Sequence, residues 1–477
     1  MVIIKHKNEN ENENEKNYKY CKKCKRIIYK KINNLNIRKA VNLWCKDKNK
    51  AIKIYGYINV WDVSSVTNMS NLFKDKREFN YDISTWDVSN VTNMEEMFHC
   101  AESFNQDISN WDVSNVTNMQ GMFAGARSFN QPLSNWDVSN VTNMEEMFYH
   151  AFSFNQAIAC WDVSNVTNMK RMFCNAFRFN QPLNNWDVSN VTNMSWMFNG
   201  ATSFNQPIGL WNVSNVTNMC SMFRKTDSFN QPINTEEITK KDGTTYIAWN
   251  VSNVRNMEYM FCEAESFNQP LNNWDVSNVT NMKDMFDNAS SFNQPLSNWD
   301  VSNVRYMERM FAEAKSFNQS LNNWNVSNVR NMKSMFAYAK SFNQQINIEE
   351  ITKEDSTTYI AWNVSNVRNM EYMFCDAESF NQSLNNWDVS NVTNMQGMFA
   401  GASSFNQPLS NWDVSNVRNM QHIFADASSF NQPLSNWDVS KVKYMDDMFD
   451  GAKSFNQDLS SWKLLRILRN KFLKLRI

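Results

Sequence analysis

The amino-acid sequence predicts an α/β repeat solenoid of about 15–16 units, each about 25 residues long, with a short parallel strand and a short helix in every unit and helical caps at both ends. Tryptophan recurs at a constant step through most of the region from Trp61 to Trp462, as at Trp111, Trp136 and Trp161, within nearly the same string, NWDVSNVTNM. Self-similarity at a fixed period is the sequence signature of repeat architectures. In addition, the 477 residues include only 9 Gly and 8 Pro, few for the turns of several separate domains. One continuous fold is therefore expected.

The strand and the helix are predicted from the apolar residues of the unit 136–160. Trp136 and Val138 alternate with polar residues, which is typical of a short strand with one buried face. From Val141 onward the apolar spacing is i, i+3, i+6, i+7 and i+10, which favours one face of a helix. The residues on this face are Val141, Met144, Met147, Phe148 and Ala151. One unit cannot bury its apolar residues alone, so the units are expected to stack and their strands to form one parallel sheet.

The chain divides into four segments. Residues 1–35 are basic and of low complexity, and they are expected to be disordered. Residues 36–57 are expected to form a helical cap on the solenoid, which covers 58–462. Residues 463–477 are expected to form a basic amphipathic helix, which either caps the last unit or contacts a membrane surface. The apolar face of the first cap is formed by Ile37, Ala40, Val41 and Trp44.

Two insertions break the constant step of the repeat. They are NTEEITKKDGTTY (234–246) and NIEEITKEDSTTY (347–359), and Trp249 and Trp324 are the first and last of the four repeat tryptophans between them. Their similarity indicates that a block of four units was duplicated. Because they leave the flanking apolar pattern unchanged, they are expected to project from one face as loops.

The repeat also resembles a known family. The pattern L-x-x-W-x-V-x-x-V-x-x-M, from Leu133 to Met144, resembles a leucine-rich repeat with Trp in a strand-facing leucine position. The longer string WDVSNVTNMxxMFxxAxSFNQPLSNW is similar to BspA-type leucine-rich-repeat surface proteins, including mycoplasma-type lipoprotein repeats of unknown function. The resemblance covers about 61–462. It implies a leucine-rich-repeat solenoid used at the cell surface for adhesion or protein interaction, without catalytic residues.

Charge and hydropathy limit the partners and the location. Residues 1–55 contain 16 Lys and Arg against 5 Asp and Glu, and 463–477 contain 6 basic and no acidic residues. The body between them has 25 basic and 43 acidic residues, a net charge of -18. This balance favours a basic protein or polymer partner over nucleic acid. Neither a secretory signal nor a membrane-spanning stretch is visible, so an intracellular or particle-associated protein is expected, whereas the resemblance implies the cell surface.

A row of aspartates follows the repeat tryptophans. Since this position lies between two buried residues, the side chains are expected to point outward on the concave face and to bind cations, a basic protein or a periodic polymer; alternatively, the row is only a solvated face. Asn takes the same place at 212, 250, 325 and 363. The members of the row are Asp62, Asp87, Asp112, Asp137, Asp162, Asp187, Asp275, Asp300, Asp388, Asp413 and Asp438. The other Asn residues of the repeat are candidates for a ladder that satisfies backbone groups between coils.

The units vary mainly between their two methionines. Examples are Glu145-Glu146, Lys170-Arg171, Ser195-Trp196 and Gln421-His422. These positions are expected on the outer, convex face of the predicted helices. On that face these residues either determine which partner binds or vary without functional constraint.

The metal and catalytic signals are weak. Cys21-Lys-Lys-Cys24 resembles half of a zinc knuckle that His6 and Cys45 could complete, but the spacing is poor and no metal or cofactor is predicted. The four histidines share no constellation, so catalysis is not expected. The sequence predicts a non-enzymatic interaction or adhesion scaffold with a long acidic face. The alternative is a structural component that self-assembles or coats a particle.

Overall fold

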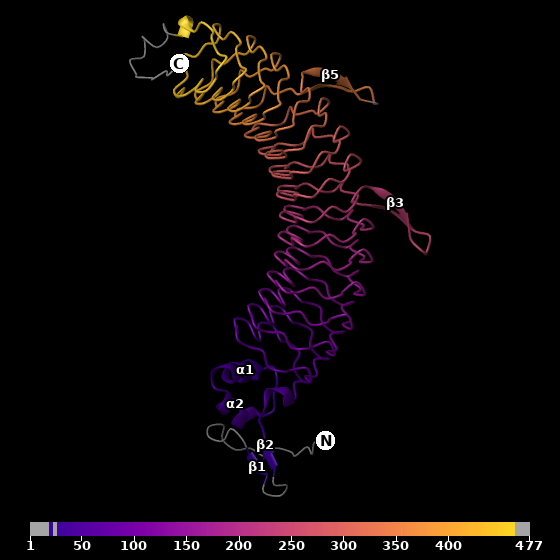
Figure 1. Ribbon diagram of the computed structural model, residues 1–477. Coiled ribbons are helices and arrows are strands. Elements are labelled where there is room, and N and C mark those ends of the chain that lie inside the picture. Colours follow the sequence, from indigo (N-terminus) through magenta and orange to yellow (C-terminus); the bar gives the residue numbers. More distant parts are fainter. Residues whose placement is uncertain (1–18, 22–25, 354, 463–477) are drawn as a thin grey trace.

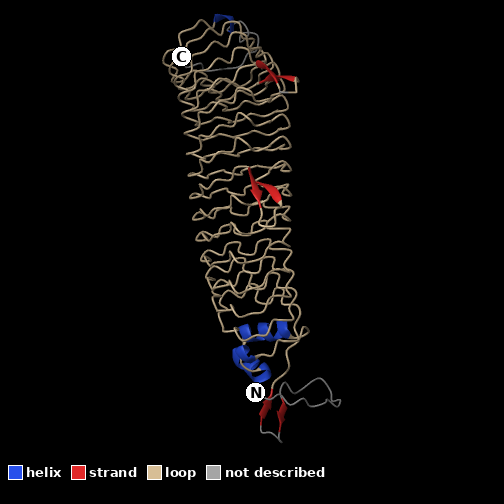
Figure 2. Cartoon of the chain, turned by 90° about the vertical axis from the view of Figure 1, so that its right-hand side faces the viewer, coloured by secondary structure: helices blue, strands red, loops and turns tan. Residues whose placement is uncertain are grey.

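The computed structural model describes residues 19–21, 26–353 and 355–462. The repeats form a long curved rod in which the chain makes one coil per unit and successive coils lie on one another (Figure 1). Most of the rod is drawn as turns and loops, and regular elements lie mainly at its first end and in the two insertions (Figure 2). They are β1 (Lys19–Cys21), β2 (Arg26–Ile28), α1 (Ile37–Lys46), α2 (Lys48–Tyr55), the 3₁₀ helix η1 (Ile58–Val60), β3 (Glu236–Thr239), β4 (Thr245–Ala248), β5 (Glu349–Thr352) and β6 (Thr358–Ala361).

Each coil is built from tight turns. The backbone N–H of Met147 donates to the carbonyl of Met144 at 3.2 Å, a three-residue step where an α-helix would use four. Glu146 and His150 have φ angles of 57° and 55°, the left-handed region that an α-helix of L-residues excludes. The apolar spacing of three residues therefore reflects successive turns.

Backbone hydrogen bonds join one coil to the next. The N–H of Glu146, turned out of its own coil, donates to the carbonyl of Lys170 in the following coil at 2.9 Å. A single parallel bridge forms at each step, as between Asn143 and Asn168, and these bridges follow one another along the rod. Alternate N–H groups along this side, from Met144 to His150, donate to the following coil, so several backbone bonds join each pair of coils although no strand of more than one bridged residue forms.

The predicted α/β leucine-rich-repeat-like fold, a solenoid of strands and helices, is therefore wrong. No described residue between 61 and 459 lies in an α-helix, and within the described residues strands occur only in the antiparallel pairs β1–β2, β3–β4 and β5–β6. The predicted parallel sheet is absent from the described units. The physical reason is that residues with left-handed φ angles turn alternate N–H groups toward the neighbouring coil. These N–H groups are then not available for the hydrogen bonds of a helix within their own coil. The alternation of burial holds without a strand, since Trp136 and Val138 are buried and Asp137 is exposed.

The core consists of columns of like side chains. Phe148 stacks on Phe123 of the preceding coil, with ring centroids 5.7 Å apart, and on Phe154 of its own coil at 3.9 Å. The indole N–H of Trp136 donates to the carbonyl of Ile108 at 3.1 Å. Each coil therefore buries its aromatic rings against its neighbours, and the core is continuous along the rod.

Polar ladders satisfy backbone groups between the coils, which confirms the role predicted for the repeat asparagines. The side-chain amide of Asn140 donates to the carbonyl of Ser114 in the preceding coil at 2.8 Å. In a second ladder the side-chain oxygen of Asn130 accepts from the backbone N–H of Asn155 at 2.9 Å. These side chains take the place of a strand ladder.

The rod bends toward its bridged side. Parallel bridges hold neighbouring backbones at about 4.8 Å, whereas the rings of Trp161 and Trp186 on the tryptophan side lie 6.4 Å apart. The hairpins β3–β4 and β5–β6, which precede Trp249 and Trp362, project from the outer side of the bend (Figure 1). The tryptophan side is therefore convex and the bridged side concave.

Helices α1 and α2 lie at the first end of the rod. Trp44 meets Trp61 of the first unit edge-on, with ring centroids 5.9 Å apart. The buried residues of α1 are Ile37, Ala40, Val41 and Trp44. Within the segment 1–35, β1 pairs with β2 in antiparallel register, so this part has regular structure. The helix predicted at 463–477 lies outside the described residues.

Candidate functional site

The aspartate row is bound to its own turns. Each of the eleven carboxylates accepts a hydrogen bond from the backbone N–H of the serine two residues later, at 2.9–3.2 Å. At Asp137 the hydroxyl of Ser139 also donates, and these bonds lower the pKa of the carboxyl. Asn212 accepts the corresponding bond from Ser214, so the turn does not require a charge. The row is thus explained locally by turn formation.

The row also lies on the opposite side from the one predicted. Lys240 of the hairpin β3–β4 pairs with Asp187 at 3.2 Å, and Lys353 of β5–β6 pairs with Asp300 at 2.9 Å. Since both hairpins project from the outer side of the bend, the aspartates lie on the convex face. The prediction of a concave acidic face is wrong, because the bend is set by the backbone bridges on the other side.

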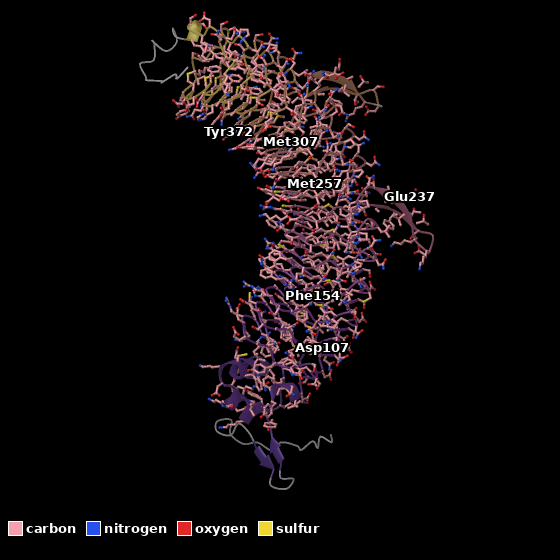
Figure 3. All side chains as sticks on the ribbon, in the orientation of Figure 1. Asp107, Phe154, Glu237, Met257, Met307 and Tyr372 are labelled. Atoms are coloured by element: carbon pink, nitrogen blue, oxygen red, sulfur yellow. The ribbon has the colours of Figure 1, made fainter. Side chains whose placement is uncertain are left out.

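The variable residues form the concave surface. We call this surface the inner face, defined by positions 145, 146, 149, 150 and 152 of the unit 136–160 and by their equivalents in the other units. Tyr372, the equivalent of 146, lies on the inner side of the bend, and Glu237 of β3 lies on the outer side (Figure 3). The expectation of a convex helical face is therefore wrong for these positions. The backbone of this surface contains residues with left-handed φ angles, such as 57° at Glu146 and 54° at Tyr372.

Charged residues of neighbouring coils pair on the inner face. Glu145 pairs with Lys170 at 2.8 Å, and Glu146 pairs with Arg171 at 2.8 Å. Apart from the two hairpin pairs, the ion pairs within the described ranges belong to this face. The four side chains Glu145, Lys170, Glu146 and Arg171 are half-buried, so these two pairs fix their positions along the rod.

Aromatic residues gather in one stretch of the inner face. The guanidinium of Arg171 lies over the ring of Trp196, 5.6 Å from its centroid. Phe152 and Phe177 stack with centroids 4.8 Å apart, and Phe177 is 40% exposed. This aromatic stretch, together with Tyr149, combines a partly exposed apolar surface with cations and carboxylates at its edge.

A buried acidic group lies further along the inner face. Arg309 donates to both carboxylate oxygens of Asp287, at 2.9 and 2.8 Å, and to Asp284 at 3.0 Å. Burial nevertheless raises the pKa of Asp287 to about 6, although Arg309 acts in the opposite direction. One oxygen of Asp284 is buried without a hydrogen-bond partner. This group can therefore change its charge near neutral pH.

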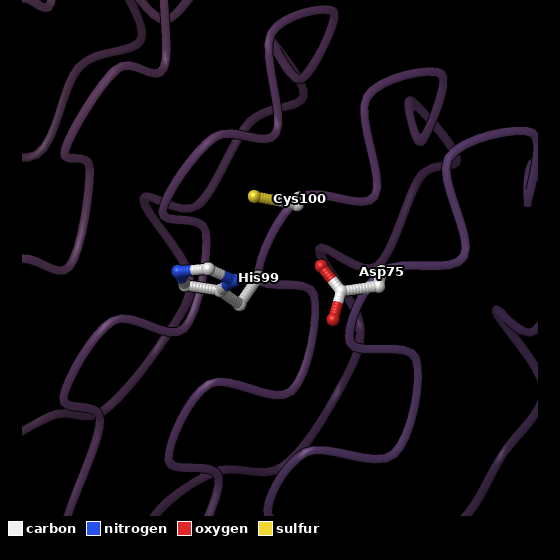
Figure 4. A group of neighbouring side chains, drawn as sticks. All are labelled: Asp75, His99 and Cys100. Atoms are coloured by element: carbon white, nitrogen blue, oxygen red, sulfur yellow. The ribbon is translucent and has the colours of Figure 1, made fainter.

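Three possible metal ligands meet near the first end of the inner face. Ligand atoms of Asp75, His99 and Cys100 all lie within 4.8 Å of one another (Figure 4). Of the sequence-predicted pair, Cys21 ends β1, and Cys24 lies outside the described residues, so the structure does not test a zinc knuckle there.

The sequence contains one signal for the unusual backbone of this face. Glycine occupies positions equivalent to 146 and 150 in several units, as in MQGMFAGA, where Gly121 and Gly125 have φ angles of 57° and 69°. Glycine at two positions four residues apart indicates left-handed conformations and opposes a helix. Nothing comparable in the sequence indicates which coils meet at the metal-ligand group.

Comparison with known proteins gives a family. Four overlapping stretches match a family described as "Mycoplasma protein of unknown function, DUF285": residues 44–161, 152–247, 235–349 and 347–462. No curated protein matches the chain. None of the helices within the described ranges is long and apolar enough to cross a lipid bilayer.

Proposed function

This chain belongs to the DUF285 family of mycoplasma proteins of unknown function, and we propose that it is a non-enzymatic scaffold that binds a protein partner on its inner face. The proposal rests on where the units differ. Core, asparagine and aspartate positions are repeated almost unchanged, whereas the inner face changes charge and size from coil to coil. A surface that discriminates between partners needs such variation, and a fold-building surface does not.

The order of the inner face supports binding. The pair between Glu146 and Arg171, and the contact of Arg171 with Trp196, hold three long side chains before any partner arrives. Prior ordering reduces the entropy that association would otherwise cost. Trp, Tyr and Arg are also the residues most often found at the centre of protein interfaces. We therefore place the centre of the interface at the aromatic stretch around Arg171 and Phe177.

The uniform acidic row is a weaker candidate. Its carboxylates accept hydrogen bonds within their own turns, and hairpin lysines already pair with Asp187 and Asp300. A row that repeats the same group offers little basis for selecting one irregular protein. Its contribution is a negative charge on the convex face, which attracts cations without selecting among them.

Affinity capture with matched variants tests this proposal. The immobilised chain is exposed to a native extract, and the retained proteins are compared for the parent, Trp196→Ala with Phe177→Ala, and Asp112→Asn with Asp137→Asn. We expect the inner-face pair to abolish retention of the partner and the outer-face pair to leave it unchanged. Circular dichroism confirms that both variants fold. Retention that is lost only in the outer-face variant would contradict the proposal.

Self-assembly is a second candidate, and the charge distribution favours it. Residues 1–55 carry a net charge of +11, from 16 basic and 5 acidic residues, and 463–477 add 6 basic residues, whereas the body carries -18. Ends and bodies of different copies therefore attract one another. Light scattering after size-exclusion chromatography at low and high salt separates the two functions. An oligomer that dissociates in high salt supports assembly, and a monomer at both salt concentrations excludes it.

A further inference from the structure

We propose that Asp75, His99 and Cys100 bind a Zn²⁺ ion at the first end of the inner face. The three ligand atoms lie within 4.8 Å of one another, and they come from two adjacent coils, Asp75 from one and the other two residues from the next (Figure 4). The Asp75 carboxylate points toward the His99 ring. The site lies on the same inner face as the proposed protein interface, outside its aromatic stretch, and the inference does not rest on that interface.

The donor set identifies the kind of metal. Ca²⁺ and Mg²⁺ prefer oxygen ligands, so a thiol and an imidazole argue against them. Sulfur, nitrogen and oxygen ligands together suit Zn²⁺, which in sites with an open position takes three protein ligands and a water molecule. The carboxylate of Asp75 and the thiolate of Cys100 would balance the charge of the ion, and the thiol proton would be released to solvent on binding.

His99 supplies a second, independent observation. Its Nδ1 atom is fully buried and has no hydrogen-bond partner. Buried polar atoms without partners are rare in folded proteins. His150, two units further along the inner face, shows the ordinary arrangement, because its Nε2 lies 3.1 Å from the side-chain nitrogen of Asn175. A metal ion beside His99 would give this ring a ligand bond in place of the missing hydrogen bond.

The backbone holds the ligands together. The N–H of Asp75 donates to the carbonyl of His99 at 2.8 Å, which fixes the two coils at this point. Beside Cys100 the next coil has Gly125, where an added Cβ would lie 3.1 Å from the sulfur. Glycine therefore leaves the thiol free on that side. The nearby arginines, Arg77 and Arg127, pair with Glu102 at 3.4 and 3.6 Å, which offsets their repulsion of a cation.

A nucleophilic role for the thiol is disfavoured. Burial, together with the charge of Asp75, raises the pKa of the Cys100 thiol. Reactive cysteines instead have lowered pKa values that favour the thiolate. A metal ion suits this arrangement, since it would stabilise the Cys100 thiolate and would be attracted by the Asp75 carboxylate.

Cobalt binding tests the site. The full chain carrying Cys21→Ser and Cys24→Ser, which removes the unrelated cysteine pair, is reduced, treated with chelator and titrated with Co²⁺. We expect one equivalent to bind with a sulfur-to-cobalt charge-transfer absorption, and Zn²⁺ to displace it. Cys100→Ser should abolish the absorption. Asp75→Asn should weaken Co²⁺ binding by at least roughly tenfold, the lower end of the loss that accompanies removal of an outer-shell partner.

Two controls make the result decisive. Asp75 is exposed and has a φ angle of 60°, which Asn accepts, so Asp75→Asn should keep the parent's circular dichroism and melting temperature without metal. His150→Ala with Cys174→Ser removes a histidine and a cysteine from the same face outside the site, and it should bind Co²⁺ like the parent. No charge-transfer absorption in the parent, or an unchanged one in Cys100→Ser, would overturn the proposal.

Discussion

The carboxylate of Asp137 accepts two hydrogen bonds from Ser139, one from the hydroxyl at 2.6 Å and one from the backbone N–H at 3.0 Å. The same backbone bond recurs at every aspartate of the row. The side-chain oxygen of Asn325 accepts the same two bonds from Ser327, from the hydroxyl at 2.7 Å and from the backbone N–H at 3.2 Å. The side-chain oxygen, and not the charge, is therefore what the turn needs.

Replacing Asp112 and Asp137 by Asn should leave the free energy of unfolding within about 0.5 kcal/mol of the parent, because the turn bonds remain. Asp137→Ala is the control, and loss of its two exposed bonds should cost up to about 1 kcal/mol. Urea titration at pH 7 measures both. A large loss of stability in the double Asn variant would show that the charge itself holds the turns.

The single variant Asp137→Asn should also change how the stability of the protein depends on pH under acidic conditions. Because the folded pKa of Asp137 is lowered, its contribution to stability is present above the unfolded value of about 3.9 and is lost as the pH falls through the folded pKa. The parent should therefore lose more stability than the variant between pH 4 and more acidic conditions. Equal losses in parallel urea titrations would contradict this role of Ser139.

The ionisation of Asp287 should give stability the opposite pH dependence from that of Asp137. Its pKa is raised to about 6 in the folded protein, so its contribution is full below the unfolded value of about 3.9 and is lost as the pH rises through 6. At about 1.4 kcal/mol per pKa unit, the difference across this window is on the order of 3 kcal/mol. Asp287→Asn should remove that slope, as measured by the difference in urea stability between parent and variant at pH 4, 5, 6 and 7. A slope that persists in the variant would assign the titration to another group.

Trp136→Ala should destabilise the rod by about 3–5 kcal/mol, because a buried ring leaves a cavity between coils. The ring packs against Phe123 at 6.2 Å, and its N–H bonds the carbonyl of Ile108. Trp136→Phe keeps an aromatic ring and removes this bond, so a smaller cost of about 1–3 kcal/mol is expected. Unfolding in urea measures both variants, and an unchanged midpoint for Trp136→Ala would contradict the packing.

Deleting 234–246 should leave the protein folded, because it restores the constant step of the repeat and removes β3 with most of the hairpin. The deletion removes few interactions with the rod: the hydroxyls of Tyr246 and Thr235 donate to the carbonyls of Leu210 and Asn273 at 2.6 and 3.3 Å, and Lys240 pairs with Asp187. A cost of about 1–3 kcal/mol is expected from two exposed hydrogen bonds and one exposed ion pair. Deleting 347–359 is the matched control, since Tyr359 bonds Asn323 in the same way. A drop in melting temperature of much more than about 10 °C in both would show that the hairpins belong to the core.

The repeat and its buried residues could be predicted from the sequence, but the local structure could not. Val141, Met144 and Met147 are buried as expected, because a spacing of three suits both a helical face and a series of three-residue turns. What decides between them is the partner of each backbone N–H, and that partner lies in the next coil. Apolar spacing within one unit contains no information on that choice.

The position of the candidate site was hidden for a related reason. The variable residues were visible in the sequence, but the side toward which the rod bends depends on the contrast between bridge spacing and ring spacing. Glu146 and Arg171 belong to different units, and only the stacking of coils places their charges 2.8 Å from each other. The group Asp75, His99 and Cys100 likewise requires two coils. Repeat-to-repeat contacts of this kind follow once the stacking step is known.

Because all coils contact one another in the same way, the length of the rod and the side chains of its inner face can change separately. Each coil contacts its neighbours through the same backbone bonds and ring stacks, so adding or removing whole units creates no new kind of junction. The two similar insertions, with four repeat tryptophans between them, are the trace of one such enlargement in this chain. Recombination can thus lengthen or shorten the rod in whole coils while the chemistry displayed along its inner face evolves by single substitutions.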